Sequence, residues 1–211
     1  NIRLIKIFFG VNLISERAFG YCENLLSIII PDSVNYIGEF AFSNCLKLEE
    51  IKIPKDILSV SEGMFFQCKN LKNIIFGSKV SYIGEWAFFQ CNSLKKIRIP
   101  DGVEYVGRYA FSECENLNQV IFPYSLKDIG YKVFSGCKRL ENISFHSSWS
   151  QKKVDKSLAL SGLNQKSNIN VSYYGDVKIF SLRCEKRCEK RCENNIAVCT
   201  ALNGKEIIVD I

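Results

Sequence analysis

Cysteine is the residue type in this sequence with the widest chemistry, because thiolates bind metals, attack electrophiles and form disulfides. The chain contains ten cysteines. Six of them follow one another at intervals of 23 residues: Cys22, Cys45, Cys68, Cys91, Cys114 and Cys137. The other four lie near the C-terminus. Cys184, Cys188 and Cys192 belong to the segment RCEKRCEKRCE, and Cys199 follows it. The two groups have different spacings and therefore predict different roles.

The six periodic cysteines are predicted to be free thiols that form a structural ladder. None of them has the paired CxxC spacing that is typical of zinc and redox sites. In stacked turns they would lie ~4.8 Å apart, but parallel Cα–Cβ bonds do not converge as a disulfide requires. A buried cysteine packs as a small apolar residue. A serine in its place would bury a hydroxyl group without a partner.

The C-terminal cysteines leave several alternatives open. Cys184, Cys188 and Cys192 recur every four residues and would form one stripe on a helix. The preferred interpretation is an amphipathic capping helix. Disulfides within the tail or to another chain are the second, and a soft-metal site completed by Cys199 is the third, because this spacing matches no zinc motif. A metal or redox role of the tail is thus the least favoured function.

Motifs for catalysis are absent from the sequence. His146 is the only histidine, and it occupies a position where four other repeats have proline, which predicts a strand end at the surface. No phosphate-binding glycine loop, HExxH or GxSxG occurs. We therefore expect no enzyme activity and no cofactor.

Four carboxylates share the position six residues before the cysteine: Glu16, Glu39, Glu62 and Glu85. We expect these side chains to form a solvated edge, and the alternative is that they bind a cation or a basic partner.

The elements that position these residues must repeat with the same period of 23. Counted from each cysteine, the third residue before it is Phe and the third after it is Leu, followed by Ile or Val at the sixth position and Ile or Phe at the eighth. The segment LxxIxIP predicts a short strand whose two aliphatic residues point inward. The next half of the repeat adds buried aliphatics and a turn glycine that is predicted to have a positive φ: Gly38, Gly84, Gly107 and Gly130. One such unit cannot enclose a core, whereas stacked units share one.

The run IGxxAFxxCxxLxxIxIPxxVxxIG resembles the BspA-like class of leucine-rich repeats, over about residues 2–149. The resemblance implies a repeat solenoid, specifically a right-handed leucine-rich repeat solenoid with a parallel β-sheet on its concave face. It also implies a role in adhesion, host-cell contact or partner binding, at the cell surface or after secretion.

Two regions are predicted. Residues 1–149 form the solenoid, which opens within a repeat, and residues 150–211 form a degenerate last turn and a small C-terminal cap. In the last turn, Leu160 and Leu163 would take the places of the cysteine and leucine, and the next strand would arrive three residues late. Strands are predicted in INVSYY and VKIFSL, and a hairpin in VCTALNGKEIIV that turns at Asn203 and Gly204.

Charge and hydropathy limit the classes of partner. The net charge of +6 is spread along the chain, so nucleic acid is not favoured. No segment approaches the ~18 apolar residues of a membrane-spanning helix. With nucleic acid not favoured and no membrane-spanning segment in the sequence, we expect the partner to be a protein or a glycan.

The candidate binding residues lie on the outward side of the predicted strands, seven residues after each cysteine, except for Lys96, which lies five residues after Cys91. Isoleucines on alternate repeats are unusual for a solvated face. The predicted site on the concave sheet consists of Ile29, Lys52, Ile75, Lys96, Arg98 and Ile121. Two alternatives stay open: high β-propensity alone accounts for the isoleucines, or the array is a structural spacer or stalk of a larger surface protein.

Overall fold

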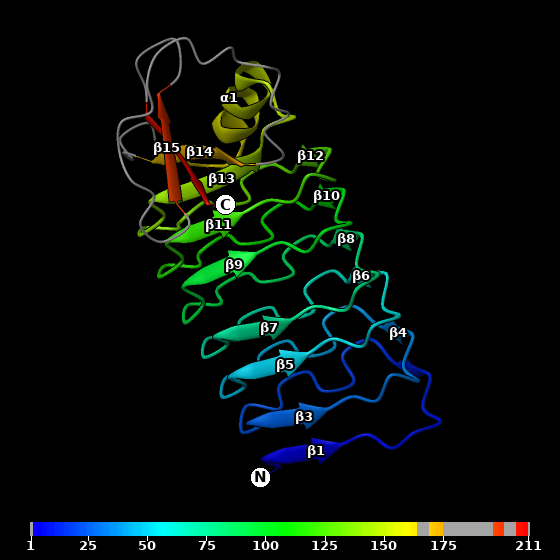
Figure 1. The fold of residues 1–211 in the computed structure, drawn as a ribbon. Helices are drawn as coiled ribbons and strands as arrows, with labels where there is room; N and C mark the ends of the chain where they lie inside the picture. The colour runs from blue at the N-terminus through cyan, green and yellow to red at the C-terminus, as the bar shows by residue number, and fades with distance from the viewer. Residues whose placement is uncertain (1, 164–168, 175–195, 201–205, 211) are drawn as a thin grey trace. The chain divides into compact units, whose positions relative to one another are not determined.

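A computed structural model describes residues 2–163, 169–174, 196–200 and 206–210 of the chain (Figure 1). The chain divides into two units, Asn1–Asp176 and Val177–Ile211. The first unit is a solenoid of parallel strands, which confirms the predicted fold class. No helix among the described residues is long and apolar enough to cross a membrane.

Each regular turn of the solenoid contributes two short strands. The first strands lie in the LxxIxIP segments and their variants, except for the last, β14, which lacks the pattern: β1 Leu4–Lys6, β3 Ser27–Ile29, β5 Glu50–Lys52, β7 Asn73–Ile75, β9 Lys96–Arg98, β11 Gln119–Ile121, β13 Asn142–His146 and β14 Asn170–Tyr174. The second strands are two residues long: β2 Leu13–Ile14, β4 Tyr36–Ile37, β6 Ser59–Val60, β8 Tyr82–Ile83, β10 Tyr105–Val106 and β12 Asp128–Ile129. Both sets ascend the unit turn by turn (Figure 1).

Strand pairing keeps the 23-residue register from β1 to β13 but is interrupted at three junctions. The first strands pair as β1-β3, as β5-β7 and as β9-β11-β13-β14. The second strands pair as β2-β4 and as β6-β8-β10-β12. Partners are equivalent residues of adjacent turns, such as Ile51 with Ile74 and Val120 with Ile143. The interruptions at β3/β5, β7/β9 and β4/β6 show that the stack does not rest on the strand ladders alone.

The interior is a set of side-chain ladders. The phenylalanine rings three residues before each cysteine stack with centroids 5.1–6.1 Å apart, in the order Phe19, Phe42, Phe65, Phe88, Phe111 and Phe134. The leucines three residues after each cysteine are buried, from Leu25 to Leu140. Because equivalent residues meet equivalent residues, one continuous core runs through all turns.

The repeated glycines serve close packing of the turns, and the prediction that they have a positive φ is wrong. Gly38, Gly84, Gly107 and Gly130 lack a positive φ. A Cβ on Gly84 would lie 2.6 Å from Glu62 N in the preceding turn, and the other three would meet backbone atoms at 2.5–2.7 Å. Positive φ values of 50–60° occur instead at non-glycine residues such as Phe40 and Trp86, five residues before the cysteine, and Asn44 and Gln90, directly before it.

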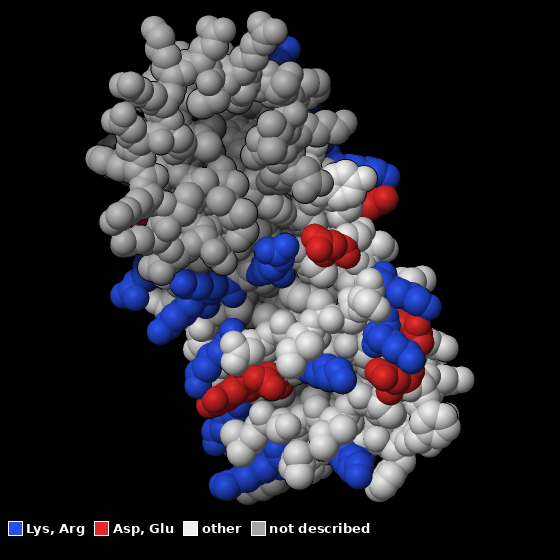
Figure 2. Space-filling model, in the orientation of Figure 1, with Lys and Arg blue, Asp and Glu red and all other residues white. Residues whose placement is uncertain are grey.

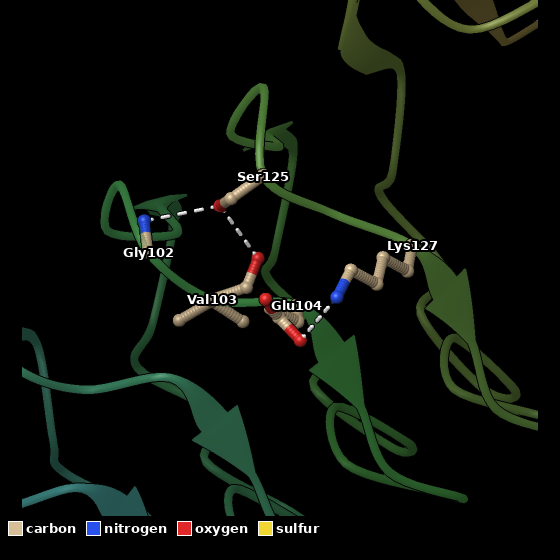
Figure 3. Close-up of polar contacts among 5 residues, drawn as sticks. All are labelled: Gly102, Val103, Glu104, Ser125 and Lys127. Carbon is tan, nitrogen blue, oxygen red and sulfur yellow. Dashed lines mark hydrogen bonds and ion pairs between the residues drawn. The ribbon is translucent and has the colours of Figure 1, made fainter.

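Polar side chains link adjacent turns at the surface. In Figure 3, Ser125 Oγ accepts a hydrogen bond from Gly102 N at 3.0 Å and donates to Val103 O at 2.8 Å. Lys127 Nζ lies 2.7 Å from Glu104 Oε2 in the same view. Each of these contacts joins one turn to the next, and the serine bridge recurs at Ser33.

The last turn contains a helix that the sequence did not predict. Helix α1, Gln151–Leu160, begins after Ser150, whose side chain accepts a hydrogen bond from Lys153 N. After the helix in the chain, β14 pairs with β13 at an offset of 28 residues, so that Ile143 is aligned with Val171. The strand therefore arrives five residues late, not three. Leu160 O accepts a hydrogen bond from Lys132 N, and the Leu160 side chain is 44% exposed, so its assignment to the buried cysteine position is wrong. The assignment of Leu163 to the leucine position stays a prediction; its side chain packs partly buried against the core.

The second unit contains an antiparallel pair, β15 Ile196–Thr200 and β16 Glu206–Asp210, as expected for the predicted hairpin. Its turn at Asn203 and Gly204 lies outside the described residues, as does VKIFSL. Cys184, Cys188 and Cys192 also lie outside them, so the capping helix stays a prediction. The predicted strand in INVSYY is β14.

Candidate functional site

The six predicted site residues lie on the first strands, on the side away from the core. Each flanks an inward residue: β5 and β9 show an exposed–buried–exposed pattern, and β3 does the same. Parallel pairing aligns Lys52 with Ile75 and Arg98 with Ile121. The structure thus places the set on one face, which we call the first-strand face: Ile29, Lys52, Ile75, Lys96, Arg98 and Ile121.

Two isoleucines of this face are open to solvent. Ile29 is 51% exposed and Ile75 is 50% exposed, whereas Ile121 is half-buried. Exposing half of a large aliphatic side chain leaves apolar area in water that a partner can cover. The apolar component of the face is therefore concentrated on β3 and β7.

The strand ladder is interrupted beside both exposed isoleucines. β3 is not paired with β5, and β7 is not paired with β9. At β7 the inward residues Ile74 and Phe76 are only half-buried, although Ile51 and Ile53 of the preceding turn are buried. The junction between β7 and β9 thus adds partly accessible core residues and strand edges to the surroundings of Ile75.

Ion pairing separates some cations of the turns from those of the first-strand face, although other turn cations, such as Lys55 and Lys69, also form no ion pair among the described residues. Four turn lysines form ion pairs of 2.7–2.8 Å with an acid of the preceding turn: Lys72–Glu49, Lys79–Asp56, Lys127–Glu104 and Lys138–Glu115. Lys52, Lys96 and Arg98 form no ion pair within the described part of the chain. Figure 2 shows Lys and Arg side chains distributed along the side on which the first strands lie. Glu50 of β5 is an acid on the same face.

The periodic cysteines form the predicted ladder of free thiols, buried except for half-buried Cys22. Each buried thiol also donates a hydrogen bond to the phenylalanine carbonyl of the preceding turn, for example Cys91 Sγ to Phe65 O at 3.3 Å. The expectation that a serine here would lack a partner is therefore wrong. Burial raises the pKa of the Cys137 thiol to about 12 and raises that of Cys91 further, so the thiolate is disfavoured at neutral pH.

The periodic carboxylates lie at the surface, as predicted. Glu16 and Glu39 are exposed, while Glu62 and Glu85 are half-buried. Burial, followed by the charges of Glu39 and Glu85, raises the pKa of Glu62. No group of three or more potential metal ligands occurs among the described residues.

His146 ends β13, as the sequence predicted. Its Nδ1 accepts a hydrogen bond from Ser148 N at 3.1 Å, and the ring meets the edges of Tyr124 and Tyr174 at centroid distances of 5.4 and 5.7 Å. Ser148 Oγ also lies 2.9 Å from Nδ1, and these contacts together hold the ring in place.

Sequence reasoning missed the aromatic residues beside the second strands. Tyr82 stacks on Tyr105 at 5.4 Å, and Trp86 stacks on Tyr109 at 5.9 Å. The signal was available, because each pair is separated by 23 residues. It was overlooked because the aromatic positions are filled in only some repeats.

Comparison with known families and structures identifies the same leucine-rich repeat fold. The family model described as "BspA type Leucine rich repeat region" matches residues 1–105 and 87–173, in six copies. No curated protein matches the sequence.

Several solved structures are similar. A leucine-rich repeat protein from Bacteroides ovatus has a TM-score of 0.57 and 22% identity, over 82% of this chain and 54% of that protein. The T. pallidum leucine-rich repeat protein has a TM-score of 0.59 and 25% identity, over 76% and 84%. A leucine-rich cell surface protein from Faecalibacterium prausnitzii has a TM-score of 0.47 and 23% identity, over 77% and 63%. The chain thus spans about half the length of the Bacteroides protein.

Proposed function

Because the chain belongs to the BspA-type leucine-rich repeat family, we propose that it is a non-catalytic interaction module that binds a protein or glycan partner through its first-strand face. The family resemblance also supports adhesion and a location at the cell surface or outside the cell. The observation that carries the proposal is the alignment of Lys52, which forms no ion pair among the described residues, with the half-exposed Ile75 on the adjacent strand.

The chemistry of the face favours an anionic partner with apolar groups. Lys52 is aligned with Ile75 on the adjacent strand, and Arg98 is aligned with Ile121. Carboxylates or sulfates placed between these side chains gain charge complementarity, and covering the isoleucines removes apolar area from water. Ile75 is the central anchor, because the open junction beside β7 adds the half-buried Ile74 and Phe76.

The test uses two anionic probes, a peptide that alternates valine and aspartate and a sulfated oligosaccharide, with binding followed by fluorescence anisotropy. Ile75→Asp and Arg98→Glu are expected to weaken binding of the preferred probe. Both should leave the free energy of unfolding within ~1 kcal/mol of the parent, as expected for surface changes.

The matched control is Lys127→Ala, which removes a lysine that is paired with Glu104 outside the face. It should leave the affinity unchanged. Unchanged affinity in both Ile75→Asp and Arg98→Glu would place the binding site elsewhere.

A structural spacer is the second candidate, and the ion pairs between adjacent turns favour it. Such links hold neighbouring turns together whether or not a partner is present. A spacer would bind neither probe above the level of the double variant Ile75→Asp, Arg98→Glu.

A further inference from the structure

The second strands present aromatic side chains that the proposed function does not use. Tyr36, Tyr82 and Tyr105 lie on the outward side of β4, β8 and β10, and Tyr36 is 51% and Tyr82 38% exposed. The rings of Tyr82 and Tyr105 stack at 5.4 Å, and four residues further along each turn Trp86 and Tyr109 stack at 5.9 Å. Accessible aromatic rings on adjacent turns are typical of interaction surfaces.

Carboxylates accompany the two aromatic rows. Glu85 lies in the chain between Tyr82 and Trp86, and Glu62 holds the same position one turn earlier. Burial raises the pKa of the Tyr82 hydroxyl, and Tyr105 and then the charges of Glu85 and Glu62 raise it further. Glu39, Glu62 and Glu85 form no ion pair within the described residues. These three glutamates form a column along the stack of turns, and this acidic column carries negative charge on three consecutive turns.

The chain's own arginines show which chemistry fits beside these rings. At one end of the column Arg17 pairs with Glu16, and its guanidinium lies 5.2 Å from the centroid of Phe40. At the other end Arg108 replaces the glutamate and lies 6.0 Å from the centroid of Tyr109. A cation next to an aromatic face gains electrostatic attraction from the ring. Between these two ends, the acidic positions have no such cation among the described residues.

We propose that this aromatic–acidic face binds an extended Lys- and Arg-rich segment of a partner protein. The face consists of Glu39, Glu62 and Glu85 with the flanking aromatic rings: Tyr82, Tyr105, Trp86 and Tyr109. Cationic side chains of the partner lie between Glu62 and Glu85 and over the rings of Tyr82 and Trp86.

The spacing of the turns matches such a segment. Adjacent turns are ~4.8 Å apart, so the three carboxylates span ~10 Å, whereas an extended chain places alternate side chains ~7 Å apart on one side. Two cations at positions i and i+2 of the partner therefore reach all three carboxylates when the partner runs along the stack. The first-strand face carries the opposite charge, so the two proposed surfaces select different partners.

The probe is a short peptide that alternates lysine and serine, and its matched control alternates glutamate and serine. Binding to the full chain is followed by fluorescence anisotropy. The lysine peptide should bind, and its affinity should fall as salt is raised, because exposed charge pairs are screened. The glutamate peptide should not bind at this face.

Two independent variants locate the site. Glu62→Gln combined with Glu85→Gln should weaken binding of the lysine peptide ~3- to 10-fold, and Tyr82→Ser should weaken it ~2- to 5-fold through loss of the ring. Ser59 occupies the position of Tyr82 in the preceding turn, so the backbone accepts serine there. The control Glu49→Gln removes a carboxylate that is paired with Lys72 and should leave binding unchanged. The unfolding midpoint of each variant is measured by circular dichroism.

Three results would overturn the proposal. The first is equal binding of the lysine and glutamate peptides to the double variant Ile75→Asp, Arg98→Glu, in which the first-strand face no longer favours an anionic peptide. The second is wild-type affinity in both the double glutamine variant and Tyr82→Ser. The third is an equal loss in Glu49→Gln, which would show that only the total charge matters. Arg98→Glu separates this face from the proposed function, because it should not weaken binding of the lysine peptide.

Discussion

The junctions on the two sides of β6 differ at the position that holds glycine in most turns. Between β6 and β8, Gly84 N donates to Val60 O at 2.7 Å, and the ladder continues through β10 and β12. Between β4 and β6 the glycine position is filled by Ser61, and the strands are not paired. There the Ser61 hydroxyl donates to Ile37 O in place of the backbone. A Cβ on Gly84 would lie 2.6 Å from Glu62 N, which explains why serine at this position prevents the close approach.

The open junction is nevertheless held by the interior. Phe42 and Phe65 stack at 5.7 Å across it, much as Phe65 and Phe88 stack at 5.4 Å across the closed one. Cys68 Sγ donates to Phe42 O at 3.0 Å, and Cys91 Sγ makes the equivalent bond at the closed junction. Backbone hydrogen bonds such as Phe40 N to Glu62 O at 2.8 Å also cross the open junction. The comparison indicates that side-chain ladders and these bonds hold the turns together where the second strands are unpaired.

The largest effect should come from Phe65→Ala, because its ring stacks on both neighbours and is fully buried. We expect a loss of about 3 to 5 kcal/mol in the free energy of unfolding, measured by urea denaturation. Lys95→Ala, at an exposed position, is the control and should stay within ~0.5 kcal/mol. A loss below ~1 kcal/mol for Phe65→Ala would contradict the role of the ladder.

The sequence predicts the interior well because burial leaves a periodic signal. Positions such as Phe88, Leu94 and Ile97 must be apolar in every turn, so the strands, the inward residues and the free thiols follow from the 23-residue period. The outward isoleucines of the candidate site follow from the same period, because residues alternate across a strand. Their part in binding is a separate matter that the period does not address.

The close approach of main-chain atoms leaves a weaker signal in the sequence than burial does. Glycine at Gly84 indicates either a positive φ or a close approach, and only the structure shows that the approach decides. Positive φ at Phe40 and Trp86 was not predictable, since bulky residues disfavour it and packing overrides that preference. Helix α1 was missed because it interrupts the period that carried the other predictions.

Gly84→Ser should convert the closed junction into an open one. The added Cβ would force the turn away from Glu62 N and remove the hydrogen bond from Gly84 N to Val60 O. We expect a loss of about 1 to 3 kcal/mol, as for overpacking. Amide hydrogen exchange near residues 83 and 84 should accelerate. Wild-type stability together with unchanged exchange would show that the stack tolerates a Cβ without opening.

Cys68→Ser should have a smaller effect, because the hydroxyl retains Phe42 O as an acceptor. We expect a loss of about 1 kcal/mol, from the shorter side chain and the cost of burying a more polar group. Cys91→Ser is the matched variant at the closed junction. If the thiol bond is more important where the second strands are unpaired, Cys68→Ser will destabilise more than Cys91→Ser in the same urea titration.

The smallest effect, and the most direct test, should come from Ser61→Gly. Removing the Cβ allows the turn to approach β4 and lets the amide of residue 61 donate to Ile37 O, as Gly84 N does to Val60 O. The gain of a backbone hydrogen bond, about 1 kcal/mol, is opposed by the greater flexibility of unfolded glycine, about 0.5 to 1 kcal/mol. Stability should therefore change by less than ~1 kcal/mol, while the amide of residue 61 becomes protected from exchange. An amide that still exchanges at the parent rate would show that something other than the Ser61 side chain keeps β4 and β6 apart.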